Sequence, residues 1–193
     1  VAKVAFELDI LDPVALMEGD LGAEKDALIQ EIGENMNVRR IAALGAGDGY
    51  VASYMHGDSK KAVLLELASR HDDLGKDLAM HVTAINPLVV ESSELSTDLL
   101  AKEREIFAAQ AAESGKPPEI IEKMVEGRLR KYLAEVSLVE QPFVKDSSLT
   151  VGQLLKQKDT ICRGFVRFEV GEGIEIVEED FAAEVAAQIK GSG

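Results

Sequence analysis

Two side chains of this sequence, Cys162 and His81, are of types that could carry catalytic or metal chemistry. Cys162 is the single cysteine of the chain and lies in residues 160–170, a run that alternates well enough to predict a strand. A lone cysteine in a strand is usually a small core residue. A single cysteine also excludes an intramolecular disulfide and a multi-cysteine metal site, which fits a reducing cytosol better than secretion.

His81 lies at the edge of the apolar face of a helix predicted over residues 72–85. Asp72 or Asp73 would cap this helix, and the Asn-Pro pair at 86–87 would stop it. No second histidine, cysteine or paired carboxylate stands four residues away to complete a metal or catalytic pair. From the residues alone, His81 is therefore more typical of a partly buried packing residue than of a ligand.

The glycine-rich string GAGDG at residues 45–49 resembles a dinucleotide loop, but such a loop needs a helix after it. Residues 50–54 predict a strand instead, so the string favours a hairpin turn. Acidic runs such as 178–180 are first of all solvated faces or helix starts in a chain this acidic. No motif indicates catalysis, and we expect a protein that is not an enzyme and needs neither metal nor cofactor.

The composition describes a folded, acidic protein of 193 residues, with 46% hydrophobic residues and a formal net charge of −14. That charge would repel a phosphate backbone or an anionic membrane, so neither nucleic acid nor a membrane is an expected partner. No apolar run approaches the roughly 20 residues that span a bilayer. The sequence predicts a soluble, cytoplasmic protein, and a start at Val1 with an end in Gly-Ser-Gly suggests a fragment.

The elements that would position these residues alternate between helices and short strands. Residues 1–16 suggest two short pieces joined by a turn, and periodic apolar residues predict helices at 21–34 and 149–156. Short runs rich in branched residues, separated by glycine turns, predict an antiparallel meander. These runs are 37–44, 50–55 and 61–68.

The middle of the chain, residues 96–144, predicts two helices folded back on each other. Ser96 or Thr97 would cap the first helix, Gly115 would end it, and Pro118 would open the second. Each apolar stripe is narrow and flanked by charges, which is typical of a hairpin that projects from a body. A projecting apolar stripe usually binds a partner.

We expect an α+β fold with two subdomains of antiparallel sheet and packed helices, plus a projecting helical coiled-coil hairpin. The first subdomain would span 1–70 and the second 71–193. The second would contain the hairpin, 96–136, and a docked terminal helix at 178–190, where Phe181 and Val185 begin a four-residue apolar repeat.

Seven motifs, which follow one another in the family's order, strongly resemble bacterial translation elongation factor Ts. Together they cover the chain from about residue 32 to residue 190. They lie at residues 32–40 (IGENMNVRR), 54–57 (YMHG), 79–82 (AMHV), 115–117 (GKP), 125–128 (VEGR), 140–144 (EQPFV) and 165–174 (FVRFEVGEGI).

The resemblance implies a guanine-nucleotide exchange factor for the GTPase EF-Tu. Such a factor binds the nucleotide-free partner more tightly than the nucleotide-bound form and therefore weakens GDP binding to the same degree. Its contacts would disturb the phosphate loop and the Mg²⁺ site of the partner. In this family one subdomain engages the nucleotide-binding domain and the other the third domain of EF-Tu.

The family's partner and dimer surfaces map onto specific residues here. His81 matches a family histidine in the partner interface, which reverses the interpretation from the residues alone. The other expected partner-binding residues are His56, Gly57, Lys61, Ala62, Val63, Phe181 and Val185. The hairpin matches the dimerisation module, which implies a homodimer or a 2:2 complex through Ile106, Phe107, Ile121, Val125, Leu129 and Tyr132.

Three departures from the family pattern concern the partner surface. The family has Thr-Asp-Phe directly before Val-Ala-Lys, whereas this sequence starts at Val1, and residues 4–21 are shorter than the family's helical segment. The family's Arg-Ile-Gly is replaced around residues 59–62, so Lys61 stands for an apolar contact. The alternative function is a docking or dimerisation module that binds a protein without nucleotide exchange.

Overall fold

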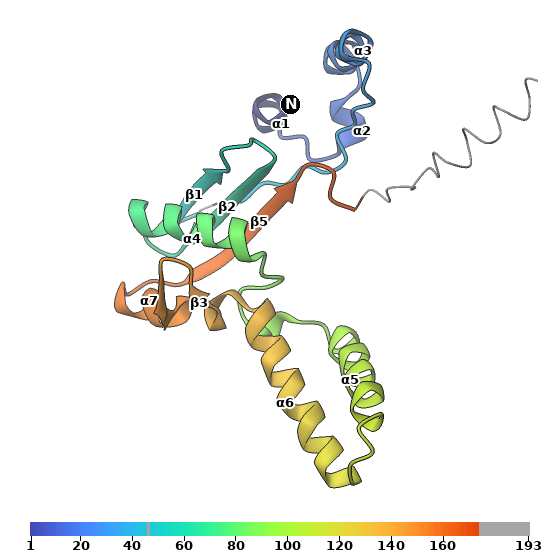
Figure 1. Cartoon of the computed structure of the whole chain (residues 1–193). Coiled ribbons are helices and arrows are strands. Elements are labelled where there is room, and N and C mark those ends of the chain that lie inside the picture. Colours follow the sequence, from blue (N-terminus) through green and yellow to red (C-terminus); the bar gives the residue numbers. More distant parts are fainter. Residues whose placement is uncertain (46, 174–193) are drawn as a thin grey trace, which may run out of the picture.

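The computed structural model describes residues 1–45 and 47–173, which form a mixed α+β structure (Figure 1). Its main sheet has three antiparallel strands in the order β1-β2-β5, namely β1 (Tyr50–Met55), β2 (Lys61–Leu67) and β5 (Cys162–Glu169). A second sheet pairs β3 (Pro142–Phe143) with β4 (Asp146–Thr150). The expected mixture of helices and antiparallel sheet is confirmed.

Helix α4 (Asp72–Ile85) covers one face of the main sheet, and the hydrophobic core lies between them. The alternation of β2 sends Val63, Leu65 and Leu67 to this face, where they pack against Leu78 and neighbouring residues of α4. The helix lies so close to β1 that a Cβ on Gly75 would be 2.6 Å from the Ala52 Cβ. The predicted bounds of helix 72–85 are confirmed, and Asn86 ends it in the left-handed conformation (φ 56°). The predicted cap is wrong, because His71 is the N-cap residue, without a side-chain hydrogen bond, and Asp72 and Asp73 lie in the first turn, where negative charge favours the helix dipole.

Two long helices project from the body as a hairpin, α5 (Thr97–Ala112) and α6 (Pro118–Val136) (Figure 1). The Ser96 hydroxyl accepts a hydrogen bond from the Leu99 amide at 3.2 Å and caps α5, as predicted. Gly115 has φ 65°, which its lack of a Cβ permits, and the chain then enters α6 through Pro117. The two predicted helices are confirmed.

After the hairpin the chain returns to the body and reaches β5. The turns η1 (Ser92–Glu94) and η2 (Leu138–Glu140) flank the base of the hairpin, where Val89 and Ser137 form a single parallel bridge. Helix α7 (Val151–Gln157) begins with a capping box between Thr150 and Gln153. Its Val151 and Leu155 join the core, so the predicted helix at 149–156 and strand at 160–170 are present with small shifts.

The first part of the chain holds three helices, α1 (Ala2–Leu8), α2 (Pro13–Leu16) and α3 (Asp20–Ile32). The two short pieces and the following helix agree with the sequence prediction. Few of their side chains are buried: α3 has no buried residue, and Phe6 of α1 is 86% exposed. This region therefore adds little to the core.

The predicted strand at 37–44 is wrong, because these residues form no strand. The free edge of β2 pairs instead with β5, about a hundred residues later in the chain, and Arg40 lies 4.6 Å above the Phe168 ring of β5. The main sheet thus takes strands from both expected subdomains, 1–70 and 71–193, whose boundary stays a prediction. The predicted helix 178–190 lies outside the described residues.

Within residues 1–45 and 47–173, no helix combines the length and apolar character needed to cross a membrane.

Candidate functional site

His81 is fully buried and joins α4 to the segment that follows the hairpin. Its Nδ1 accepts a hydrogen bond from the Val144 amide at 3.2 Å, so its proton is on Nε2, which donates to the Gln141 side-chain oxygen at 2.9 Å. Gln141 in turn donates to the Glu135 carbonyl at 2.6 Å, and the Phe143 ring stacks on the imidazole. His81 therefore fixes residues 141–144 against the helix.

The environment of His81 keeps it neutral. Burial lowers the pKa of the imidazole, although the hydrogen bond with Gln141 acts in the opposite direction. Both ring nitrogens already have partners inside the chain. The structure thus supports the packing role, and the predicted contact of the ring itself with a partner would require residues 141–144 to move.

A recess of about 450 Å³ lies beside the buried His81, where three parts of the chain meet. The turn between β1 and β2, the exposed side of α4 and the residues after β3 form its walls. Its lining residues are Tyr54, His56, Lys61, Met80, Thr83, Ala84, Val144 and Lys145.

Local hydrogen bonds fix the turn that forms one wall. The His56 amide donates to the Lys61 carbonyl at 2.9 Å, and the Asp58 carboxylate accepts from the Lys60 amide at 2.9 Å. Ser59 takes the left-handed conformation (φ 58°) that closes the turn. These contacts place His56 and Lys61 side by side at the rim.

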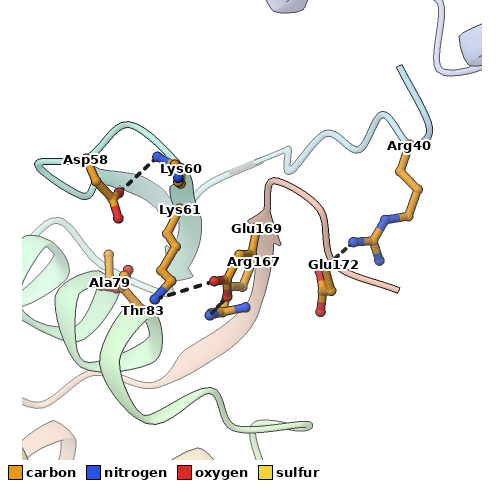
Figure 2. Close-up of polar contacts among 9 residues, drawn as sticks. All are labelled: Arg40, Asp58, Lys60, Lys61, Ala79, Thr83, Arg167, Glu169 and Glu172. Carbon is orange, nitrogen blue, oxygen red and sulfur yellow. Dashed lines mark hydrogen bonds and ion pairs between the residues drawn. The ribbon is translucent and has the colours of Figure 1, made fainter. Parts of the chain in front are cut away.

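A charged cluster lies along the sheet next to this wall, and Figure 2 shows Lys61 and Arg167 both contacting Glu169. The Lys61 Nζ is 3.5 Å from a Glu169 oxygen. Arg167, whose side chain is only 8% exposed, donates to the other Glu169 oxygen, and this bond, more than Lys61, lowers the pKa of that carboxyl. Glu169 is therefore ionised and shared between two cations.

Of the expected partner-binding residues that the structure describes, four lie at or next to the turn between β1 and β2 and are at least partly exposed, and two are buried. His56, Gly57 and Ala62 are exposed, and Lys61 is partly so. Val63 is 2% exposed and packs in the core, as does His81 at 0%. Any role of these two in binding would act through what they hold in place, and Phe181 and Val185 lie outside the described residues.

Sequence reasoning missed most residues of the recess. Met80 lies within the motif at 79–82 and Val144 within that at 140–144, and Thr83, Ala84 and Lys145 come just after these motifs. Their nearness to two motifs is a signal that could have found them. The expected dimerisation residues lie mostly within the hairpin itself, since Val125 is buried and the Phe107 and Tyr132 rings meet edge to face at 6.2 Å.

The remaining chemistry-bearing residues form no site in the described part of the chain. Cys162 is buried, as predicted for a core cysteine, and burial raises the pKa of its thiol to about 12. Among residues 1–45 and 47–173, no group of three histidine, cysteine or acidic side chains is placed to hold a metal ion.

Comparison with known proteins then settles the family. Residues 4–172 match the family described as "Elongation factor TS". This chain belongs to the elongation factor Ts family. It is 51% identical over 191 residues to the elongation factor Ts of Hahella chejuensis, covering 99% of this chain and 66% of that protein. It is 49% identical to those of Saccharophagus degradans and Methylococcus capsulatus, covering 100% of this chain and 66% and 67% of those proteins.

The chain thus spans about 66% of the length of these elongation factor Ts relatives. The matched region, 4–172, includes every residue that lines the recess and the whole helical hairpin. Both surfaces are therefore parts of the family's own sequence.

Proposed function

We propose that this chain is a guanine-nucleotide exchange factor in translation elongation, which binds EF-Tu and promotes the release of GDP. It would act in the cytoplasm, where elongation takes place. Family membership and the resemblance of seven motifs to elongation factor Ts support this function.

The observation that carries the proposal is the convergence of three of those motifs on one recess. Tyr54 and His56 come from the first, Met80 from the second and Val144 from the third, although up to 90 positions separate them in the sequence. Packing explains why the second and third motifs lie together, since His81 holds residues 141–144 against α4, but it does not require residues of all three motifs to line an open hollow. A concave surface built from separate segments is typical of a binding site for another macromolecule or ligand.

The physical basis of exchange in this proposal is linkage between two ligands of EF-Tu. A factor that binds the nucleotide-free form more tightly must weaken GDP binding by the same factor. A rigid surface suits this role, because only differential contacts with the two forms shift the equilibrium. Helix α4 is rigid in this sense, since Leu78 and Val82 are buried under it and His81 holds the adjoining segment.

The hairpin is proposed as a coiled-coil dimerisation module, giving a homodimer or a 2:2 complex. Most of its apolar residues already pack between α5 and α6, but Ile106 and Ile120 are 48% and 41% exposed. These exposed isoleucines would lie in the contact with a second copy. We further propose that one of the two subdomains, 1–70 and 71–193, engages the nucleotide-binding domain of EF-Tu and the other its third domain.

The test is the rate at which a fluorescent GDP leaves purified EF-Tu in stopped flow when this chain is added. The proposal predicts a large acceleration that rises with the concentration of the chain. Complex formation by calorimetry without acceleration would instead support the alternative, a docking or dimerisation module. Absence of both would exclude this chain as a partner of EF-Tu.

A further inference from the structure

The recess has a charge opposite to that of the chain as a whole. The chain carries a formal net charge of −14, yet none of the described residues that line the recess is acidic. Two of them, Lys61 and Lys145, are cations, and His56 adds an imidazole at the rim. The rest of the lining is mainly apolar or hydroxylic. A protein this acidic therefore presents a local site suited to negative charge.

The charged side chains next to Lys61 do not cancel one another. Strand pairing sets Lys61 opposite Glu169 and Val63 opposite Arg167, so one carboxylate lies between two cations (Figure 2). The Arg167 Nε is buried and has no hydrogen-bond partner within the described part of the chain. A second carboxylate, Asp58, lies in the turn near Lys60 and Lys61, so the two carboxylates face three cations, Lys60, Lys61 and Arg167, and one positive charge is left at this edge of the recess.

Lys145, on the opposite wall, already has a partner. Its Nζ is 2.6 Å from an Asp77 oxygen, and Asp77 lies outside the recess lining. The longer contact of Lys61 with Glu169, 3.5 Å, leaves Lys61 the more available donor. The excess positive charge of the recess is thus assigned mainly to Lys61.

We infer that this recess receives a carboxylate side chain of EF-Tu, bound by Lys61 and flanked by apolar contacts with Met80, Ala84 and Val144. The inference rests on the proposed function and names the chemistry of the partner at the same site. Lys61 then replaces the apolar contact of the family pattern with an ion pair. Removal from water strengthens such a pair, because an enclosed site screens charge less than open solvent does.

The test compares Lys61→Met with Lys60→Met in calorimetric titrations against purified EF-Tu, at 50 mM and 500 mM salt. Both variants lose one charge, but Lys60 is exposed and does not line the recess. We expect Lys61→Met to weaken binding about tenfold at low salt, the size of one enclosed ion pair, and much less at high salt. Lys60→Met should change the affinity less than twofold. Thermal melts of both variants would show that the fold is kept.

Three outcomes would overturn the inference while leaving the proposed function standing, provided that the wild-type chain binds. Equal losses in the two variants would mean general electrostatic attraction, and tighter binding by Lys61→Met would mean an apolar contact. A loss confined to GDP-bound EF-Tu, absent from the nucleotide-free protein, would assign the anion to a phosphate and not to a carboxylate. Failure of the wild-type chain to bind EF-Tu would instead remove the proposed function and, with it, this partner.

Discussion

The body and the hairpin of this chain are built on different physical principles. In the body, one face of a sheet and helix α4 bury a contiguous cluster, with Leu65, Leu67 and Leu78 at 0% exposure. In the hairpin, α5 and α6 each have a single buried residue, Ala111 and Val125. Burial of apolar surface supplies most folding free energy, so the body is the more strongly stabilised region, while the hairpin buries little apolar surface by itself.

This contrast in burial matches the two roles proposed for the body and the hairpin. In the proposed function, the surface that discriminates between two forms of a GTPase would need fixed geometry, which the body has around the recess. A surface that associates with another copy can be a two-helix projection with a narrow apolar seam. The largest effects of mutation should therefore fall in the body, and the smallest in the hairpin.

The largest expected effect is that of Leu78→Ala in α4. Removing a fully buried leucine side chain leaves a cavity and costs about 3 kcal/mol of unfolding free energy. The matched change Leu129→Ala in the hairpin, where the leucine is only half-buried, should cost about 1 kcal/mol. Urea denaturation followed by circular dichroism measures both. Equal losses of unfolding free energy in the two variants would contradict the difference in packing between body and hairpin.

A smaller effect concerns pH. Burial lowers the pKa of His81 in the folded chain, so between that value and 6.5 the unfolded chain binds more protons. The stabilisation by neutral His81 is therefore present above pH 6.5 and is lost as the pH falls below it. The measurement is the unfolding free energy of the wild type and of His81→Asn between pH 7 and pH 5. The wild type should lose stability faster than the variant, and parallel curves would contradict this account.

The smallest effect is expected for Ser96→Ala at the start of the hairpin. Loss of the hydroxyl that accepts from the Leu99 amide should cost about 1 kcal/mol, confined to the first turn of α5. Hydrogen exchange of amides in α5 should quicken while exchange in α4 stays unchanged. Faster exchange in both helices would mean that the hairpin and the body unfold together.

Local sequence signals were enough to predict the helices of this fold. Residues 72–85 show helical periodicity between two acids and an Asn-Pro stop, and α4 has these bounds, although the acids lie in its first turn and do not cap it. The two helices of the hairpin could also be predicted from the sequence, because Ser96, Gly115 and Pro118 are strong signals of helix ends. Such signals act within a few residues, where backbone preferences are decided.

The pairing of strands and the make-up of the recess could not be predicted in the same way. Residues 37–44 look like a third strand of a meander, but β5 takes that place through contacts across the sequence. The β-propensity of a segment indicates that it can form a strand, but it does not determine which other strand it pairs with. Likewise, no sequence pattern links Met80 with Lys145. Only the packing of α4 against the residues after β3 brings them to the same recess.

The central claim is that the recess of the body, and not the hairpin, drives nucleotide release. The most direct test fills the recess with Ala84→Trp and uses Ala109→Trp on the hairpin as the matched control, because both alanines are exposed. The measurement is the rate of fluorescent GDP release from EF-Tu in the presence of each variant. The account predicts that Ala84→Trp abolishes the acceleration while Ala109→Trp retains it. Retained acceleration by Ala84→Trp would contradict the account.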